Sequence, residues 1–388
     1  MSNTADVIII GAGVHGASLA FHLAQRGAKA LVLEKKFIAA GATGRSSGLV
    51  RMHYDVRQDS ELAWVSFRYF RDWKELVGGD CGFTRTGFLQ LVAPPDTETL
   101  KANVAMHQDI GIPVFLIGQD DVRRLAPSFA TDDIELAAYE PESGYAMPSD
   151  TASALMSAAR DTAARLMQEC TVRGVMVAGG KVTGVQTSQG DLGAPIVVNA
   201  AGAWAGTVNK MVGLDVPYDT WRHDTMFVVR PPQIGPGHPS VIDFANDMYF
   251  RPERGLTLVG LEDGNPLGES PDCDTDHARK GFVERGIDRI CRRIPIMENG
   301  GLHSAHGGYD GITPDQRPLL GAAGPDGFYL DCGFSGTGFK ISPAVGLCMS
   351  ELILDGESKT VDLSIYSPAR FAAGRSVMGE HPYSTVWH

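Results

Sequence analysis

Apolar positions near the start of the chain form two short, unbroken runs with a helical stretch between them. Residues 6–10 (DVIII) are rich in β-branched side chains and predict a strand buried on both faces of a parallel sheet. Residues 17–26 repeat apolar side chains at helical spacing, and Gly27 predicts the end of that helix. Residues 30–34 (ALVLE) are a second buried run, so the pattern predicts a βαβ unit of about 30 residues.

The pattern changes between residues 85 and 147, where short apolar runs alternate with helical patches. Residues 87–92 (GFLQLV) predict a strand, and residues 119–125 (QDDVRRL) predict a helix with acidic residues at its N-terminus. An alanine-rich helix is expected over residues 151–168, and a buried strand at residues 196–200 (IVVNA). The βαβ pattern is therefore interrupted and then resumes.

Residues 221–304 return to short alternating strands that are separated by glycine and proline turns. The strands expected here are residues 226–230, 248–251 and 256–261, and they are typical of an antiparallel sheet. The rest of the chain combines a strand, a glycine-rich loop and a helix over residues 343–354. The chain thus begins and ends with parallel α/β material.

We therefore expect an α/β fold in which an antiparallel-sheet domain is inserted, in two pieces, into a Rossmann-like dinucleotide-binding domain. The discontinuous dinucleotide-binding domain is expected to comprise residues 1–84, 148–220 and 305–388. The inserted domain, expected to bind the substrate, comprises residues 85–147 and 221–304.

The composition narrows the function classes. Apolar residues make up 43% of the 388 residues and charged residues 21%, which excludes a disordered or collagen-like chain. No apolar run approaches the ~18 residues of a membrane span, and no basic segment precedes the first strand, so neither a membrane span nor a signal peptide is expected. The net charge of −12 repels phosphate backbones, so we expect no nucleic-acid partner.

Six cysteines are scattered along the chain without a C-x-x-C pair. This spacing argues against a zinc or iron–sulfur site, and no histidine and acidic residues have metal-ligand spacing, so we expect no metal. Free thiols are typical of a reducing compartment, and we therefore expect the protein to be cytoplasmic.

The turn between the first strand and the first helix carries the pattern G-x-G-x-x-G in residues 11–16 (GAGVHG). Gly11 permits the tight turn, Gly13 lets the backbone approach a pyrophosphate, and Gly16 lets the helix pack closely on the strand. The helix N-terminus offers N–H groups to phosphates, and Glu34 at the end of the second strand accepts hydrogen bonds from a ribose. The unit therefore predicts a dinucleotide site.

Two later segments indicate that the dinucleotide is FAD. Residues 198–204 (VNAAGAW) are a buried strand that ends in small residues, which permit close passage beside a cofactor. Residues 333–340 (GFSGTGFK) follow a strand and open onto a helix, whose N-terminus stabilises negative charge on a flavin ring. No second G-x-G-x-x-G unit is present, so we expect the substrate itself to reduce the flavin, as in an oxidase or a dehydrogenase.

With these motifs the sequence resembles the D-amino-acid-oxidase-like (DAO) family of FAD-dependent amine oxidoreductases, and within it the sarcosine oxidase and glycine oxidase branch. The resemblance covers most of the chain. It rests on segments in a specific order: residues 11–16 with Glu34, 41–48 (GATGRSSG), 199–204 (NAAGAW), 249–252 (YFRP), 313–315 (TPD) and 333–340 (GFSGTGFK). The fold that it implies is a discontinuous FAD domain beside a substrate domain whose antiparallel sheet roofs the flavin.

The resemblance also assigns cofactor-binding residues by position. They are expected to be Gly11, Gly13, Val14, His15, Gly16, Glu34, Lys35, Thr43, Gly44, Arg45, Ser46, Ser47, Val172, Ala200, Ala201, Gly202, Trp204, Gly333, Ser335, Gly336, Thr337, Gly338 and Lys340. Some relatives hold FAD covalently, through a cysteine or a histidine. The matching positions are Gly307 or Gly308 and Arg45, which carry no nucleophile, so non-covalent FAD is expected.

In the sarcosine oxidase pattern two cations clamp the substrate carboxylate, and the matching residues are Arg51 and Lys340. Arginine offers a planar pair of donors to a carboxylate, and lysine adds a point charge. Tyr249, on a strand expected to roof the site, completes the expected catalytic set. Glycine oxidases place an arginine just upstream of the Thr-x-Asp segment, where residues 309–312 (YDGI) stand instead, and this disfavours that mode of binding.

A lysine promotes reaction with O₂ in monomeric sarcosine oxidases, and Thr257 is expected to stand in its place. Without a cation there, O₂ is expected to be a poor electron acceptor, and the acceptor is O₂ or another oxidant. An isolated histidine such as His223 is expected to be structural.

These features predict oxidation of the C–N bond of a small amino acid, with a secondary, N-methyl or cyclic amine, to an imine. One alternative is dehydrogenation of a 2-hydroxy acid, for which His53 or His306 would supply a base. The other is the flavin subunit of a multi-subunit amine dehydrogenase, which the missing lysine and the C-terminal residues 376–388 support. An oligomer is compatible with each of these.

Overall fold

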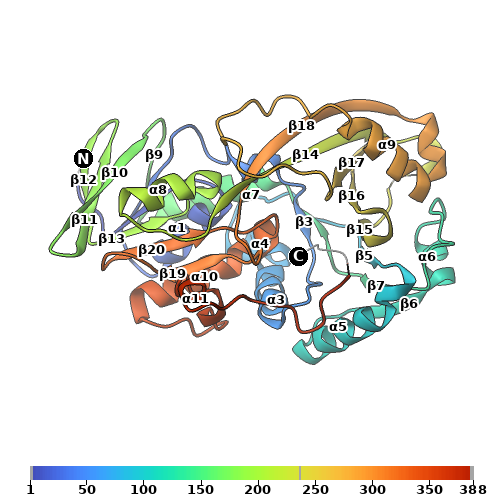
Figure 1. The fold of residues 1–388 in the computed structure, drawn as a ribbon, viewed down its shortest axis with the longest axis horizontal. Coiled ribbons are helices and arrows are strands. Elements are labelled where there is room, and N and C mark those ends of the chain that lie inside the picture. The colour runs from blue at the N-terminus through green and yellow to red at the C-terminus, as the bar shows by residue number, and fades with distance from the viewer. Residues whose placement is uncertain (1–2, 236, 385–388) are drawn as a thin grey trace.

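The computed structural model describes residues 3–235 and 237–384 and places two large β-sheets beside one another (Figure 1). The first sheet has six strands in the order β19-β20-β13-β1-β2-β9. Their bounds are β1 (Val7–Ile10), β2 (Ala30–Leu33), β9 (Arg165–Met167), β13 (Ile196–Asn199), β19 (Leu319–Ala322) and β20 (Phe328–Cys332). β1 pairs in parallel with β2 and β13, whereas β19, at one edge, runs antiparallel to β20. Neighbouring strands therefore come from distant parts of the sequence.

The first sheet is buried on both faces because alternate side chains enter different cores. Val7 and Ile9 of β1 pack in the core on the helical face, whereas Ile8 and Ile10 pack in the core on the other face. The helical layer contains α1 (Val14–Gln25), α3 (Arg57–Arg71), α7 (Pro148–Thr162) and α10 (Gly338–Asp355). The opposite face is covered by α8 (Ala205–Met211) and by a small antiparallel sheet of β10 (Val172–Ala178), β11 (Lys181–Thr187) and β12 (Gly190–Gly193).

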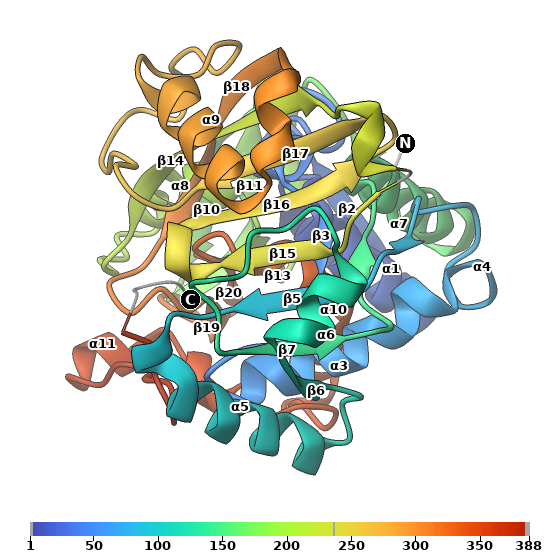
Figure 2. The same cartoon turned by 90° about the vertical axis from the view of Figure 1, so that its right-hand side faces the viewer.

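The second sheet has eight strands in the order β18-β14-β17-β16-β15-β5-β7-β6, and Figure 2 shows it face-on. Their bounds are β5 (Phe88–Leu91), β6 (Phe115–Gly118), β7 (Leu136–Glu140), β14 (Asp219–Val229), β15 (Ser240–Asp243), β16 (Met248–Glu253), β17 (Leu256–Leu261) and β18 (Gly301–Ile312). On its outer face, Phe250 packs with α6 (Gln119–Leu125) and α9 (Phe282–Arg293). On its inner face, Tyr249 joins the core of the first sheet's helical layer. The sheet therefore presents one face to the other half of the molecule.

The remaining elements are short, except for α5 beside β6 and β7. They are α2 (Ala42–Arg45), β3 (Leu49–Val50), α4 (Trp73–Leu76), β4 (Thr84–Arg85), α5 (Thr97–Ile110), β8 (Gly144–Tyr145) and α11 (Ala369–Ala372), together with single 3₁₀ turns. The C-terminal segment returns to the rest of the chain, where the Tyr383 hydroxyl lies 2.6 Å from Nε2 of His53 and Ser384 donates to Asp96. Residues 385–388 of the expected tail lie outside the described residues.

The α/β fold expected from the sequence is confirmed, and several expected elements agree closely with the structure. β17 and α6 have the expected bounds, and β1 begins one residue later than expected. The division into domains at the expected residues stays a prediction. The later strands of the eight-stranded sheet, β14 to β18, begin at Asp219 and continue to Ile312, beyond the expected limits of 221 and 304. β14 and β18 pair along their whole length, which explains why the sheet extends on both sides of those limits.

Two expected helices are wrong at one end. The helix expected over residues 151–168 ends at Thr162, because residues 165–167 pair with β2 as strand β9 and this pairing overrides the helix propensity of the alanines. The helix expected from residue 343 begins at Gly338. Pro343 has no N–H and so cannot donate to the Phe339 carbonyl, which lies four residues earlier in the helix. The Ser342 hydroxyl donates to that carbonyl instead, so the proline is tolerated.

Within the described ranges, no helix is both long and apolar enough to span a membrane. All six cysteines are free thiols.

Candidate active site

A cavity of about 620 Å³ lies between the carboxyl ends of the parallel strands and the inner face of the eight-stranded sheet. In α/β folds this edge of a parallel sheet is where ligands bind, and the volume is typical of a cofactor or ligand site. One end is lined by the β1–α1 turn and the end of β2, and the other by side chains of β14 and β16. The cavity therefore spans both halves of the molecule.

The β1–α1 turn is shaped by glycines that approach neighbouring segments closely. Gly11 has φ +111, and a Cβ there would overlap the Ala200 carbonyl. A Cβ on Gly13 would lie 3.2 Å from Oγ1 of Thr43, which in turn accepts a hydrogen bond from the Val14 N–H at 3.0 Å. The backbone at the start of α1 therefore faces the cavity, and its dipole favours an anionic group there.

The carboxylate of Glu34 is fixed at the end of β2 by two backbone donors. Its Oε2 accepts a hydrogen bond from the Ala12 N–H at 3.0 Å, and its Oε1 accepts one from the Lys36 N–H at 2.7 Å. Because Glu34 also lines the cavity, its carboxylate is held for a hydroxyl donor such as a ribose.

A loop that follows β17 closes the same end of the cavity. The ammonium of Lys35 lies 3.6 Å from the ring centroid of Trp204. Asp272 accepts hydrogen bonds from Lys35 Nζ and from Trp204 Nε1, each at 3.0 Å. The eight-stranded half of the molecule thus contributes a polar contact over the glycine turn.

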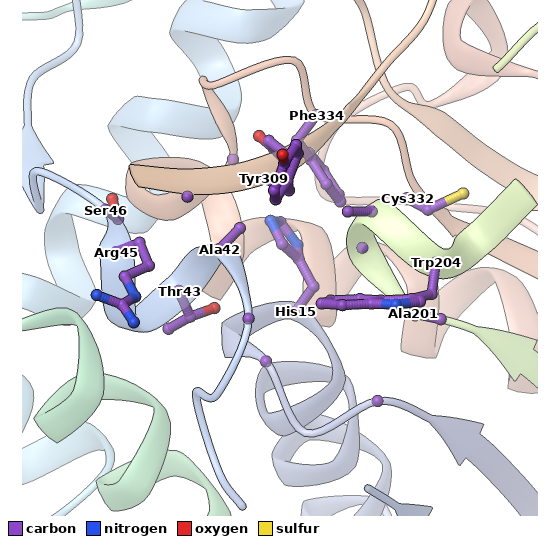
Figure 3. Close-up of a pocket in the computed structure, with 18 of the residues that line it drawn as sticks. His15, Ala42, Thr43, Arg45, Ser46, Ala201, Trp204, Tyr309, Cys332 and Phe334 are labelled. Carbon is purple, nitrogen blue, oxygen red and sulfur yellow. The ribbon is translucent and has the colours of Figure 1, made fainter. Parts of the chain in front are cut away.

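In the middle of the cavity, His15 and Phe334 form a stacked pair, as Figure 3 shows, with ring centroids 3.4 Å apart. Asp331 at the end of β20 lies 3.6 Å from Nδ1 of His15. Burial lowers the pKa of His15 to about 3 and raises the pKa of Asp331 to about 7. Neither side chain has a hydrogen-bond partner among the described residues, and both line the cavity. These buried polar groups can therefore form hydrogen bonds with a polar ligand in the cavity.

Two buried cations stand at the far end of the cavity. Arg51 is 5% exposed and Lys340, in the first turn of α10, is 7% exposed. The Arg51 guanidinium lies 4.4 Å and the Lys340 ammonium 5.6 Å from the centre of the Tyr54 ring. Burial, and then the charge of Arg51, hold the pKa of Lys340 well below its ordinary value. This arrangement favours an anionic ligand, which relieves the repulsion between the two cations.

The eight-stranded sheet supplies Tyr249, His223 and Glu262 opposite these cations. Gly260, on the neighbouring strand β17, leaves the space that the Tyr249 ring occupies. The Tyr249 hydroxyl lies 3.0 Å from Nε2 of His223, and the same nitrogen lies 3.5 Å from Oε1 of Glu262. A carboxyl, an imidazole and a phenol therefore meet on one wall.

The residues that are present fit FAD. The glycine turn is a cradle that a Cβ would fill, and Glu34 is fixed where a ribose needs an acceptor. The polar atoms of His15 and Asp331 that have no hydrogen-bond partner among the described residues line the same cavity. A dinucleotide needs a glycine turn and a ribose acceptor together in one cavity.

Most of the expected site residues line this one cavity, and their roles stay predictions. Those that line it are Gly11, Gly13, Val14, His15, Glu34, Lys35, Thr43, Arg45, Ser46, Ser47, Arg51, Val172, Ala200, Ala201, Gly202, Trp204, Tyr249, Ser335, Gly336, Gly338 and Lys340. The four that lie behind its wall are Gly16, Gly44, Gly333 and Thr337. Gly16 packs against the Gly11 carbonyl, and the Thr337 hydroxyl donates to the Phe334 carbonyl, so both support the loops that line the cavity.

The expected place of Thr257 is wrong. Thr257 lies near the far end of β17 and does not line the cavity, and its hydroxyl contacts Nε2 of His238 at 2.9 Å. Two histidines expected as bases for a hydroxy acid are also not in the wall. His53 contacts Tyr383, and His306 contacts Thr225.

Glu262, His223, Trp221 and Asp331 line the cavity but were not among the expected site residues. A sequence signal exists for Glu262, because it follows Gly260 at the strand period of two and so shares its face. His223 can be placed in the wall only if the pairing of Thr225 with Gly260 is known. In this antiparallel register His223, two residues before Thr225, lies opposite Glu262, two residues after Gly260. That register is set by contacts between strands and is not visible in either strand alone.

Comparisons with known proteins agree with this geometry. A family model described as FAD dependent oxidoreductase (DAO) matches residues 6–352. Human mitochondrial sarcosine dehydrogenase is 28% identical over 387 residues, covering 96% of this chain and 42% of that protein. Human mitochondrial dimethylglycine dehydrogenase is 27% identical over 385 residues, covering 95% of this chain and 44% of that protein. The chain thus spans about two-fifths of the length of these curated relatives.

Solved structures share the whole fold. L-proline dehydrogenase from P. horikoshii superposes with a TM-score of 0.90 at 26% identity, covering 97% of this chain and 100% of that one. Glycine oxidase from Geobacillus kaustophilus superposes with a TM-score of 0.83 at 25% identity, covering 95% of this chain and 99% of that one.

Proposed function

The chain belongs to the DAO family of FAD-dependent oxidoreductases, and on that premise we propose that it oxidises the C–N bond of a small amino acid to an imine. The nitrogen of this substrate is secondary, N-methylated or cyclic. One observation carries the proposal: Arg51 and Lys340 are two buried cations at one end of the cofactor cavity, where the carboxylate of an amino acid pairs with both. The names of the relatives, which include sarcosine, dimethylglycine and L-proline dehydrogenases, support this substrate class.

The mechanism assigns each part of the wall a task. Bound FAD supplies the hydride acceptor. Arg51 and Lys340 bind the substrate carboxylate, and its negative charge raises the pKa of Lys340 back toward the ammonium form. Tyr249 and the inner face of the eight-stranded sheet exclude water and orient the C–H bond that is broken, which lowers the entropic part of the barrier.

The experiment mixes the purified holoenzyme anaerobically with glycine, sarcosine, N,N-dimethylglycine, L-proline and lactate, and follows bleaching of the visible flavin band. Bleaching by sarcosine or L-proline supports the proposal. Bleaching by lactate alone would move the function to a 2-hydroxy-acid dehydrogenase, a second candidate that His223 in the cavity wall favours. The rate at which the colour returns in air tells whether O₂ or another oxidant is the acceptor. No bleaching by any of them, with flavin bound and a partner protein co-purifying, would favour the flavin subunit of a larger complex.

Variants of the two cations test the carboxylate clamp. Lys340→Met removes one partner of a buried charged contact, which costs about 2–5 kcal/mol and weakens substrate binding at least about 30-fold. Lys359→Met is the matched control, because Lys359 is exposed and pairs with Asp355 outside the cavity. An unchanged concentration dependence of bleaching in the Lys340 variant would contradict the clamp.

We propose that FAD is held without a covalent bond. Arg45 packs against Gly308, so the two positions that carry the link in some relatives offer no nucleophile. Burial raises the pKa of the Cys332 thiol far above its ordinary value, so this cysteine of the cavity wall stays a poor nucleophile. Acid precipitation is expected to release all of the yellow colour into the supernatant, and flavin in the washed pellet would contradict the proposal.

A further inference from the structure

Glu262 is a buried carboxyl that no step above uses. It follows β17 directly and lines the cavity, and its side chain is 8% exposed. Its Oε1 atom has no hydrogen-bond partner among the described residues. A buried carboxyl oxygen without a partner is costly, and such a group at a cavity wall is typical of a functional site.

Four charged groups surround this carboxyl. Lys340 from α10 and Arg51 from the segment after β3 favour its ionised form, whereas Asp263 beside it and Asp247 across the hairpin oppose it. Burial, aided by the two aspartates, outweighs the two basic residues and raises the pKa of Glu262 well above its ordinary value. The carboxyl therefore holds a proton more strongly than a carboxyl in water does.

His223 is a further neighbour of this carboxyl. Burial lowers the pKa of His223 to about 4, so the ring is uncharged at neutral pH. Its Nε2 lies 3.0 Å from the Tyr249 hydroxyl and 3.5 Å from Oε1 of Glu262, and its Nδ1 lies 3.4 Å from Nδ2 of Asn265. The ring therefore places a polar but uncharged group beside Glu262.

This placement complements a zwitterion. An amino acid whose carboxylate pairs with Arg51 and Lys340 carries its ammonium group at the opposite end of the same small molecule. Glu262 is the cavity-lining carboxyl on the wall that faces the two cations. A carboxyl with a raised pKa is also closer in basicity to an amine, so a proton passes between the two at small cost.

We propose that Glu262 is a catalytic residue whose carboxylate form, which Lys340 and Arg51 favour, takes the ammonium proton of the bound amino acid before the C–H bond breaks. The N–H bond breaks, an O–H bond forms at Oε1, and the electron pair stays on nitrogen, so the step needs no oxidant. The free pair on nitrogen then stabilises the positive charge that develops at carbon as hydride leaves. This inference rests on the proposed amino-acid oxidation.

The test is the pH dependence of anaerobic flavin bleaching by sarcosine in three holoenzymes: wild type, Glu262→Gln and Asp263→Asn. The glutamine is isosteric but accepts no proton, so bleaching at neutral pH is expected to slow by about 10²- to 10⁴-fold. At a pH above the pKa of the free amine, sarcosine arrives already deprotonated, and the rate of the variant is expected to recover to within about tenfold of wild type. Asp263→Asn keeps the Glu262 carboxyl but removes a neighbouring negative charge that raises its pKa, so this variant is expected to bleach at neutral pH at least as fast as wild type, with any shift of its profile toward lower pH.

A measurement of ligand binding at equilibrium tests the role of Glu262 without any catalytic turnover. 2-Methylalanine and trimethylacetate have the same shape and carboxylate, but the first carries an ammonium group where the second carries a methyl, and the first has no α-hydrogen to lose. Their binding is followed through the flavin spectrum. Glu262→Gln is expected to weaken 2-methylalanine at neutral pH by about tenfold or more and to leave trimethylacetate bound as tightly or more tightly.

The outcomes separate the two proposals. If sarcosine and L-proline bleach the wild type but Glu262→Gln keeps the wild-type pH profile, the inference about Glu262 is overturned and the proposed function stands. A loss that is equal at every pH, with both carboxylates weakened alike, shows a structural role and also overturns it. If no amino acid bleaches the wild type, the proposed function fails and the inference falls with it.

Discussion

The contact between Gly260 and Tyr249 allows a sharp test of how the active-site wall is built. A Cβ at Gly260 would overlap the Cζ, Oη and Cε1 atoms of Tyr249, well inside the roughly 3.5–4 Å at which carbon atoms are in contact. Gly260 has an ordinary strand conformation, so alanine is excluded by the ring alone and not by the backbone. Gly260→Ala therefore pushes Tyr249 away from His223 without touching either side chain chemically.

The magnitude follows from these contacts. Forcing extra volume into a packed site costs about 1–3 kcal/mol, and losing the 3.0 Å contact between Tyr249 and His223 adds about 0.5–1.5 kcal/mol. Gly260→Ala is thus expected to lower the free energy of unfolding by roughly 2–4 kcal/mol. In a Tyr249→Ala background the ring is gone, and the same change is expected to stabilise by about 0.5–1 kcal/mol, because glycine inside a strand is itself unfavourable.

The assay is denaturant unfolding of the wild type, the two single variants and the double variant. Gly255→Ala is the matched control, since a Cβ at Gly255, in the turn between β16 and β17, meets no atom within 4 Å. The sign of the Gly260 effect should reverse between the two backgrounds. An equal destabilisation in both would refute the reasoning, because the cost would then not come from the Tyr249 ring.

Two further predictions concern the cofactor half of the cavity. Glu34→Ala leaves the N–H groups of Ala12 and Lys36 without acceptors, so FAD binding to the apoprotein is expected to weaken by about 2 kcal/mol, roughly 30-fold, in titrations. Glu34→Gln keeps one acceptor oxygen and should weaken FAD binding less. Equal FAD affinity in the wild type and both variants would contradict the role of Glu34. Asp331, with a pKa of about 7 when folded, binds a proton in the native state that the unfolded chain has already lost, so its own contribution to stability falls as pH rises from about 4 to 7, by up to roughly 4 kcal/mol, whereas the contribution of the neighbouring His15, with a pKa of about 3, rises. Asp331→Asn removes only the falling contribution, so denaturation midpoints of the apoprotein should rise more steeply with pH than in wild type, while the exposed control Asp326→Asn keeps the wild-type slope; an unchanged slope in the Asp331 variant would contradict the assignment.

The parts of the site that could be predicted from the sequence depend on contacts between residues close in the chain. In the turn of residues 11–16 the positive φ of Gly11 and the close approach of Gly16 to the Gly11 carbonyl are local, whereas the close approaches of Gly11 to Ala200 and of Gly13 to Thr43 involve distant segments. Glu34 follows from the same unit, because its partners Ala12 and Lys36 lie within it. The pattern of residues 333–340 likewise predicts that a helix follows, although α10 already begins within it at Gly338.

The parts that could not be predicted depend on register between distant strands. Thr257 was expected over the flavin, but the pairing of Tyr249 with Gly260 places the cavity at the other end of β17, beside Glu262. His223 reaches the wall only because Thr225 pairs with Gly260. One residue of slip would turn these side chains to the opposite face, and nothing within a single strand fixes that choice.

The strand order of the first sheet has a consequence for the order of events during synthesis. β1 is finished at Ile10, its first neighbour β2 begins at Ala30, but its other neighbour β13 begins only at Ile196. At about 5–20 residues per second on the ribosome, β1 waits roughly 10–40 s for that second neighbour. During this interval the open edge of β1 and the side chains of Ile8 and Ile10 on one of its faces are not covered by β13. β1 therefore gains its second neighbour only after the residues between Ile10 and Ile196 have been synthesised.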